Sequence, residues 1–307
     1  MSARSVRTLI RNSSALLSIV CEYGRPFPFT YIQRRRFRRS GRDDQMSTSR
    51  LMQTLAPTRC QKNVFKKASL VIFDKDGTLI CFHAIWVPWA INVAKRISET
   101  TNMDVEAEIY SLLGLHKEER RVQPGLLAEG TMSQIRDAIS RLLINRGIEA
   151  ADAVKHVMAA ILESSDCNEH SVKEIFDLRS LFLQLRENGI KIAICTSDSR
   201  KGTITALRQL HLESHIDMVV CGDDAGSIPK PHPHNALSIC RTLDVDPQDT
   251  LVVGDTLADM KMGRSANLGS TVGVLSGVCG INELRPHADH IGYRSFPVVE
   301  QSLKSKE

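Results

Sequence analysis

Two carboxylates that stand two residues apart follow a strongly apolar run near residue 70. The run Ser69-Leu-Val-Ile-Phe leads into Asp74, and Asp76 follows after one lysine. In extended backbone, residues two apart point to the same face, so both acids can approach one ligand. Gly77 lets the chain turn away, and Thr78 can tie that turn to backbone. Such a pair suits a two-step phosphoryl transfer in which one acid attacks and the other moves a proton.

Three further segments carry groups that could bind phosphate or a cation. Thr196 and Ser197 close an apolar segment, where a hydroxyl and the following amides can hold phosphate oxygens, although Thr196 could instead be a helix N-cap. Lys230 lies between two prolines, in a stiff loop that either aims its ammonium at a phosphate or exposes it to solvent. Asp255 and Asp259 are four residues apart at a loop-to-helix junction, close enough to face one centre.

The charges of these groups call for a cation. The acids concerned are Asp74, Asp76, Asp255 and Asp259. Together they carry up to −4 against one lysine, and a phosphate monoester adds about −2. At an effective dielectric near 20, each unbalanced like pair about 4 Å apart costs about 4 kcal/mol. Mg²⁺ takes oxygen ligands and can bridge carboxylate and phosphate, so we expect a Mg²⁺ site here.

Alternating strand and helix patterns position these groups. The segment 69–74 is continuously apolar, as in a parallel strand buried on both faces. From residue 178 the pattern predicts helices at 178–188, 201–210, 234–243, 258–266 and 297–303, and strands at 190–195, 217–221, 250–254, 271–275 and 289–292. This alternation predicts an α/β fold with a doubly wound parallel sheet, in which ligands bind beyond the carboxyl ends of the strands.

A block with helical spacing interrupts this alternation after the first strand. Residues 83–177 show apolar residues at helical intervals and no convincing strand. We therefore expect an all-helical domain inserted into a discontinuous core. The predicted organisation is an Arg-rich extension over 1–50, an α/β core over 66–82 and 178–307, and a helical cap over 83–177.

The ordered motifs resemble the haloacid dehalogenase (HAD) superfamily of phosphohydrolases. They are Asp74-x-Asp76-Gly77-Thr78, Thr196, Lys230 and Gly254-Asp255-x-x-x-Asp259, within roughly residues 68–280. The helical insert is similar to the C1-type cap of the phosphoglycolate phosphatase-like branch. The resemblance implies a HAD-like, Rossmannoid core and the hydrolysis of a phosphoric monoester.

The same resemblance implies a role for each motif residue. Asp74 would be the nucleophile that forms an aspartyl-phosphate, and Asp76 would protonate the leaving alcohol and then activate water. Mg²⁺ would be bound by Asp74, the backbone carbonyl of Asp76 and Asp255, with Asp259 a ligand directly or through water. Thr196 and Lys230 complete the expected catalytic set. The expected substrate-binding residues are Gly77, Thr78, Thr196, Ser197 and Lys230.

Two departures from the usual family pattern leave the substrate open. The chain continues with Ile80-Cys-Phe-His83 where relatives often have an acid and a small hydroxyl residue, and Lys75 occupies a usually apolar position. Trp86, Trp89 and His83 could line the pocket under the cap, although tryptophans three apart also pack one helix face.

We expect a Mg²⁺-dependent phosphatase for a small phosphomonoester, with phosphoglycolate the nearest candidate by resemblance. A nucleotide or sugar phosphate is an alternative substrate. A different alternative is a catalytically silent HAD-fold binding module whose Arg-rich arm contacts nucleic acid, but no catalytic acid is lost. The expected partner is therefore a small phosphorylated metabolite and not nucleic acid.

The first 50 residues differ in composition from the rest. They hold eleven arginines and three acids, a net charge of +8, which leaves −3 for residues 51–307 of a 307-residue chain at +5. Arginines at helical spacing beside apolar residues are typical of a mitochondrial presequence. We expect a mitochondrial protein, or a cytoplasmic one if translation starts at Met46 or Met52. The arginine-rich segment 34–39 could instead bind nucleic acid.

Cysteine usage and hydropathy exclude two further classes. The eight cysteines stand singly, without a C-x-x-C pair, so we expect no zinc site and interpret them as free thiols in a reducing compartment. The longest apolar runs fall far short of the roughly 18 residues that span a bilayer, so we expect no membrane insertion.

Overall fold

A parallel six-stranded sheet organises the computed structural model, which describes residues 68–166 and 172–293. The strand order is β5-β4-β1-β6-β7-β8, and each neighbouring pair is parallel. The strands are β1 (Leu70–Phe73), β4 (Lys191–Cys195), β5 (Met218–Val220), β6 (Thr250–Gly254), β7 (Ser270–Val274) and β8 (His290–Gly292). The fold-class prediction is confirmed for the core, whereas the predicted extension over 1–50 and helix at 297–303 lie outside the described residues.

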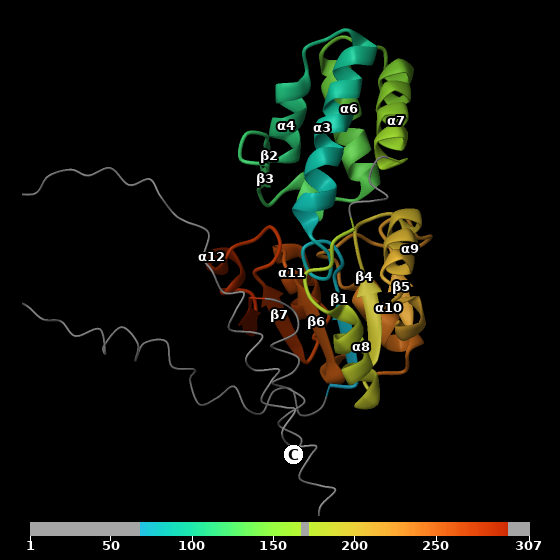
Figure 1. Ribbon diagram of the computed structural model, residues 1–307, viewed down its shortest axis with the longest axis vertical. Coiled ribbons are helices and arrows are strands. Elements are labelled where there is room, and N and C mark those ends of the chain that lie inside the picture. The colour runs from blue at the N-terminus through green and yellow to red at the C-terminus, as the bar shows by residue number, and fades with distance from the viewer. Residues whose placement is uncertain (1–67, 167–171, 294–307) are drawn as a thin grey trace, which may run out of the picture. The chain divides into compact units, whose positions relative to one another are not determined.

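Helices cover both faces of this sheet (Figure 1). They are α8 (Leu178–Glu187), α9 (Arg200–Gln209), α10 (His234–Thr242), α11 (Leu257–Ser265) and α12 (Ile281–Leu284), with 3₁₀ turns at Glu213–His215 and Pro247–Asp249. Val71 and Phe73 of β1 pack in a cluster with residues of α8 and α9, while Leu70 and Ile72 pack in another with residues of α10 and α11. A strand buried on both faces explains the continuous apolar run.

In the described part of the chain between β1 and α8, the structure has five helices. They are α3 (Phe82–Thr101), α4 (Glu106–Leu113), α5 (Leu126–Glu129), α6 (Met132–Asn145) and α7 (Ala150–Asp166). Their apolar side chains form a hydrophobic cluster of their own, to which Val278 also belongs. Thr131 begins α6 with a capping box in which Gln134 takes part. We interpret this segment as the cap.

The prediction that the cap contains helices alone is wrong. Residues Leu115–His116 (β2) and Arg121–Val122 (β3) form a two-stranded antiparallel hairpin. Gly114 ends α4 in the left-handed conformation, with φ at 72°. Leu115 and Val122 then turn inward to the cap cluster while their neighbours are exposed. Strands of two residues are too short to show alternation in a sequence.

The chain enters and leaves the cap through two paired segments. Cys81 N–H donates to the carbonyl of Lys173 at 2.8 Å, and Ile175 N–H donates to the carbonyl of Leu79 at 2.9 Å. Entry and exit are therefore adjacent, as an insertion into a loop requires. Among the described residues, no helix combines the length and the apolar character needed to cross a membrane.

Candidate active site

The carboxyl ends of three neighbouring strands bring most of the predicted site residues together. In the sheet, β1 lies between β4 and β6, with Phe73 opposite both Ile194 and Val253. Asp74, Thr196 and Asp255 follow these strands within two residues and therefore reach the same edge. The chain runs from β1 to strands on one side and later to strands on the other, so this edge is a topological switch point.

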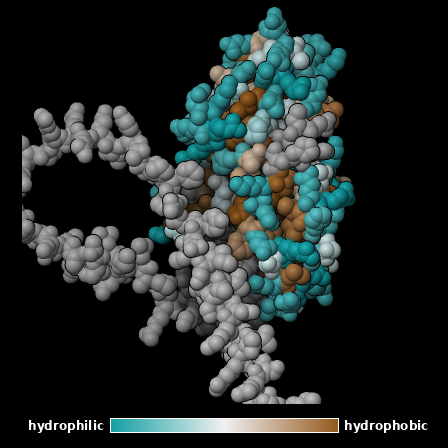
Figure 2. Space-filling view, in the orientation of Figure 1, coloured by the Kyte–Doolittle hydropathy of each residue, from teal (hydrophilic) through white to brown (hydrophobic). Residues whose placement is uncertain are grey.

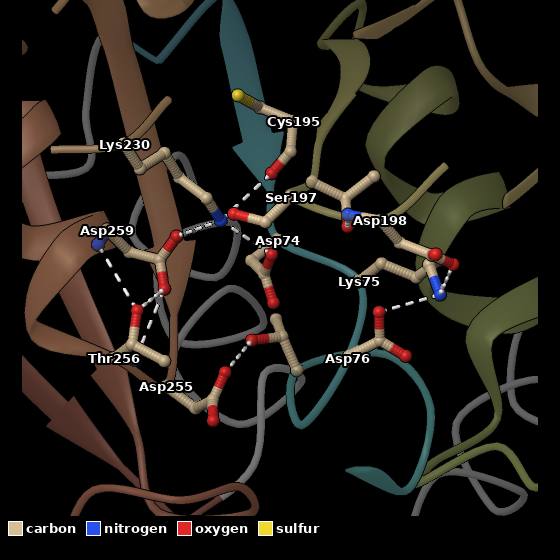
Figure 3. A network of polar contacts seen from close by, with 12 residues as sticks. Asp74, Lys75, Asp76, Cys195, Ser197, Asp198, Lys230, Asp255, Thr256 and Asp259 are labelled. Carbon is tan, nitrogen blue, oxygen red and sulfur yellow. Dashed lines mark hydrogen bonds and ion pairs between the residues drawn. The ribbon is translucent and has the colours of Figure 1, made fainter. Parts of the chain in front are cut away.

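Lys230 joins two of the acids (Figure 3). Its Nζ donates to Asp74 Oδ1 at 2.7 Å, to Asp259 Oδ1 at 2.6 Å and to the carbonyl of Cys195 at 3.3 Å. The side chain of Lys230 is 5% exposed, which excludes the solvent-exposed alternative. Burial lowers the pKa of Lys230, but the carboxylates of Asp259 and Asp74 raise it further, so it stays well above its ordinary value. Lys230 is a fixed cation.

Asp255 is held by the turn that follows β1. Thr78 Oγ1 donates to Asp255 Oδ1 at 3.2 Å, and the backbone N–H of Val278 donates to Oδ2 at 2.8 Å. Gly77 has φ at +88°, and a Cβ there would lie 2.4 Å from Asp255 Oδ2. Only glycine fits such a contact. Gly77 and Thr78, predicted to bind substrate, both contact Asp255, and neither lines the catalytic pocket described below.

Asp259 also lies in the first turn of α11. Thr256 Oγ1 donates to Asp259 Oδ2 at 2.6 Å, and the two residues form the capping box of α11. A Cβ at Gly254 would lie 2.3 Å from Asp259 Cγ, so the carboxylate packs directly on the end of β6. One oxygen of Asp259 accepts a hydrogen bond in this capping box, and the other accepts one from Lys230.

The geometry and charge of three acids fit a divalent cation. Asp74, Asp255 and Asp259 are buried, and each offers an oxygen within 4.8 Å of the others. Burial raises the pKa of Asp74 to about 7 against the opposing effect of Lys230. Burial and then the charge of Asp74 raise the pKa of Asp255 well above its ordinary value. One lysine therefore does not balance the cluster, and oxygen ligands are those that Mg²⁺ prefers.

The sequence predicts the side chain of Asp76 on the same face as that of Asp74. In the structure the side chain of Asp76 points to a second lysine, Lys75 (Figure 3). Lys75 Nζ lies 2.7 Å from Asp76 Oδ2 and 3.0 Å from Asp198 Oδ2, and all three side chains are at most 10% exposed. Burial raises the pKa of Asp76 more than the Lys75 charge lowers it. Asp76 Oδ1 is buried and accepts no hydrogen bond from the described residues.

The residues after β4 connect the core to the cap. Thr196 Oγ1 accepts a hydrogen bond from the Asp198 N–H at 3.1 Å. Thr196 is not a helix N-cap, because α9 begins after Ser199, whose side chain caps it. Ser197 Oγ donates to the backbone carbonyl of Glu129 in α5 at 3.0 Å, so this residue, which also lines the catalytic pocket described below, links core and cap.

A small catalytic pocket lies among these groups. It has a volume of about 20 Å³, room for roughly one water. Core residues Asp74, Asp76, Thr196, Ser197, Asp198, Lys230 and Thr256 line it, together with Phe82, Trp86, Leu127, Ala128, Glu129, Gly130, Met132 and Ile135 from the cap. His83 is elsewhere, because its Nε2 accepts a hydrogen bond from the Val122 N–H at 3.5 Å.

Comparison with known proteins decides the family. A family model of haloacid dehalogenase-like hydrolases matches residues 68–267, more than half of the chain. The chain belongs to the haloacid dehalogenase-like hydrolases. It is therefore an enzyme of this family, as the resemblance of its motifs implied.

Several relatives of this hydrolase are phosphate-cleaving enzymes. Pyrophosphatase PpaX of Bacillus mycoides (strain KBAB4) is 24% identical over 200 residues, which cover 65% of this chain and 80% of that protein. A phosphoglycolate phosphatase of Nitrosospira multiformis is 37% identical over 84 residues, 27% of this chain and 36% of that protein. A solved β-phosphoglucomutase from Clostridium difficile shares the fold, with a TM-score of 0.53, 19% identity and coverage of 78% and 98% of the two chains.

Three polar residues of this hydrolase's site were given no role from the sequence. Asp198 pairs with Lys75, Thr256 caps Asp259, and Glu129 lines the pocket from the cap. Lys75 could have indicated the position of Asp198, because a buried ammonium beside a core strand needs carboxylate partners. Threonine three residues before an acid is also a capping-box pattern. Nothing in the sequence around Glu129 indicates its position.

Proposed function

We propose that this hydrolase is a Mg²⁺-dependent phosphatase that cleaves a small phosphomonoester through an aspartyl-phosphate on Asp74. The observation that carries the proposal is the separation of the two acids of the first motif. Asp74 lies in the carboxylate cluster with Lys230, while Asp76 lies beside it on a different lysine. Environments that separate two carboxylates allow one to attack and the other to carry a proton.

The chain's own groups support a division of work. Lys230 holds Asp74 through one oxygen, which orients the other oxygen for attack on phosphorus. Asp76 lines the same pocket, and its raised pKa favours the protonated form that a leaving alcohol needs. After the alcohol has left, the same carboxylate would take a proton from water. Thr196 and the amides after it border the pocket where phosphate oxygens would lie.

The cation has a limited part in this proposal. Asp74, Asp255 and Asp259 would hold Mg²⁺. When bound, Mg²⁺ supplies positive charge that offsets the repulsion between the carboxylates and a phosphate dianion. Burial raises the pKa values of Asp74 and Asp255 and the neighbouring carboxylates add to the rise, so a bound cation would stabilise the ionised forms of both acids, which supports this assignment.

The direct test is hydrolysis of p-nitrophenyl phosphate with and without Mg²⁺. We expect turnover with Mg²⁺, none with a chelator, and recovery when Mg²⁺ is added back. Asp74→Asn should abolish turnover, because the attacking charge is lost. Full activity of a metal-free preparation, or of the Asp74→Asn variant, would refute the proposal. Phosphoglycolate, nucleotide and sugar phosphates then define the substrate, with phosphoglycolate tested first on account of the Nitrosospira relative.

The place of action is a separate part of the proposal. Residues 1–50, which lie outside the described residues, carry the composition of a mitochondrial presequence. We expect them to direct a fused fluorescent reporter to mitochondria and to be dispensable for turnover. A diffuse cytoplasmic signal would contradict this localisation.

A further inference from the structure

A second cavity lies beside the catalytic pocket. It has a volume of about 590 Å³, within the range of about 300–1,000 Å³ that is usual for small-molecule sites. Residues of α3, α6 and α7 line one side, and residues of α9 line the other. Figure 2 shows apolar surface in the middle of the described part of the molecule and mostly hydrophilic surface at its upper end. Met158 and Leu162 of α7 line the cavity and are 53% and 63% exposed, so it has an open apolar margin.

The cavity adjoins the catalytic pocket. Trp86, Met132 and Asp198 line both spaces. Lys75 borders the cavity and donates to Asp76, which lines the pocket. A group attached to a phosphate in the pocket can therefore extend past Trp86 and Met132 into the cavity. The cavity, at about 590 Å³, offers far more room for the rest of a substrate than the pocket, at about 20 Å³.

The lining of the two spaces favours a leaving group with an apolar body. The cap residues that border the catalytic pocket are apolar or glycine, except Glu129. A carboxylate on the alcohol would thus meet apolar surface and another acid. Of the cations that line the cavity, Lys75 is bound to two carboxylates, Arg136 pairs with Asp137 at 3.1 Å, and Lys201 is exposed. Trp86, whose ring lies 5.3 Å from that of the buried Trp89 in an edge arrangement, instead offers contacts for an apolar or aromatic group.

We propose that this cavity binds the leaving group, and that the substrates are phosphomonoesters of alcohols with an apolar or aromatic body. This inference rests on the proposed phosphatase function and names its substrate class. It predicts that 2-phosphoglycolate, whose leaving group is small and anionic, is a poor substrate. The selectivity arises because burial of the alcohol's apolar surface in the cavity orients the ester for attack by Asp74.

The kinetic test uses a series of n-alkyl phosphates from methyl to hexyl, with Mg²⁺. The leaving alcohols in this series have nearly the same acidity, so chain length changes burial and little else. We expect kcat/KM to rise with each methylene by up to about fourfold, the factor for removing one methylene from water. 2-Phosphoglycolate should be no better than methyl phosphate. p-Nitrophenyl phosphate serves as the check of the phosphatase function itself.

The binding test uses the protein's own fluorescence. The chain has two tryptophans, Trp86 and Trp89, and both line the cavity. In the Asp74→Asn variant, which should not turn over, hexyl phosphate should change the tryptophan emission saturably and at lower concentration than methyl phosphate. Ala159→Phe adds a ring to an exposed cavity position of α7 and should reduce the preference for hexyl over methyl phosphate. Ala151→Phe, on the same helix but lining neither space, should leave the preference unchanged.

The outcomes separate the two levels of the proposal. If no ester is hydrolysed, including p-nitrophenyl phosphate, the phosphatase function fails and the inference fails with it. If p-nitrophenyl phosphate is hydrolysed but the alkyl series is flat, or 2-phosphoglycolate is the better substrate, the inference is overturned and the phosphatase function stands. An equal effect of Ala159→Phe and Ala151→Phe would also overturn it. A rising series with a selective effect of Ala159→Phe supports it.

Discussion

The ammonium of Lys75 is the group whose removal has the most predictable effect. It lies 2.7 Å from Asp76 and 3.0 Å from Asp198, and the side chains are 3%, 10% and 10% exposed. Lys75→Met keeps the length of the aliphatic stem and removes the charge, so both carboxylates lose their cation in a buried place. Breaking a buried ion pair in this way costs about 3–5 kcal/mol of unfolding free energy, which lowers the Tm of a protein of this size by about 6–20 °C.

Urea unfolding followed by circular dichroism measures this effect at pH 7. The matched control is Lys95→Met, because Lys95 pairs with Glu99 at 3.6 Å on the surface, where both side chains are more than 60% exposed. That change should cost less than about 0.5 kcal/mol. Adding Asp198→Asn to Lys75→Met removes one of the two stranded charges and should restore part of the lost stability.

The pH dependence of the Lys75→Met effect gives a second check. Without the ammonium, the pKa of Asp76 rises further above its ordinary value, because the effect of Lys75 that lowers it is gone. The destabilisation should therefore be largest near neutral pH and smaller near pH 5, where the carboxyl group can take up a proton. A loss below about 1 kcal/mol with an unchanged urea slope, or no recovery with Asp198→Asn, would refute the argument.

Three further predictions concern the cation and the two acids. Asp255→Asn should raise the Mg²⁺ concentration needed for half-maximal turnover, and an unchanged requirement in a Mg²⁺ titration would disprove its role as a ligand. Asp76→Asn should slow hydrolysis of the aspartyl-phosphate by about 10²–10⁴-fold. Acid quench and mass spectrometry should then detect phosphate on Asp74. Phosphate on Thr196 or Ser197 would contradict the mechanism. The pKa of Asp74 is raised to about 7 in the folded chain. With a chelator present, the folded state therefore binds more protons than the unfolded state between about pH 4 and 7. The free energy of unfolding should then fall as pH rises through this window. Urea midpoints should show Mg²⁺ restoring more stability at pH 8 than at pH 5, and an equal gain at both would count against this.

The core could be predicted because its strands are buried on both faces. A continuous apolar run bounded by a polar turn identifies a parallel strand in isolation, and the predicted strand 250–254 coincides with β6. The convergence of the motif residues then follows from the topology, since the carboxyl ends of parallel strands share one edge. The β2–β3 hairpin was missed, since its strands have only two residues each. It follows directly after Gly114, the residue that ends α4.

The contacts of individual side chains could not be predicted in the same way. Extended geometry predicts Asp74 and Asp76 on one face, but the turn at Gly77 directs their side chains to different lysines. Thr78 was expected to bind backbone, whereas its hydroxyl donates to Asp255, which is 177 residues away in the chain. Glu129 and Trp86 reach the pocket only because the cap packs there. Such contacts depend on tertiary structure, which local pattern does not contain.

The placement of the two lysines explains how adjacent acids can have different chemistry. Lys230 comes from a distant loop and binds Asp74 and Asp259. These are two of the three acids whose oxygens are close enough to bind a divalent cation. Lys75 comes from the motif itself and binds Asp76 together with Asp198, outside that cluster. The charge of Asp76 still raises the pKa of Asp74, but each acid has a different lysine as its nearest cation. With separate cations, Asp74 can stay ionised beside a bound metal while Asp76 remains able to gain and lose a proton. Lys75, the departure from the family pattern, lowers the pKa of Asp76 against the effect of burial, which would help this carboxyl group to lose its proton again before it acts as a base toward water.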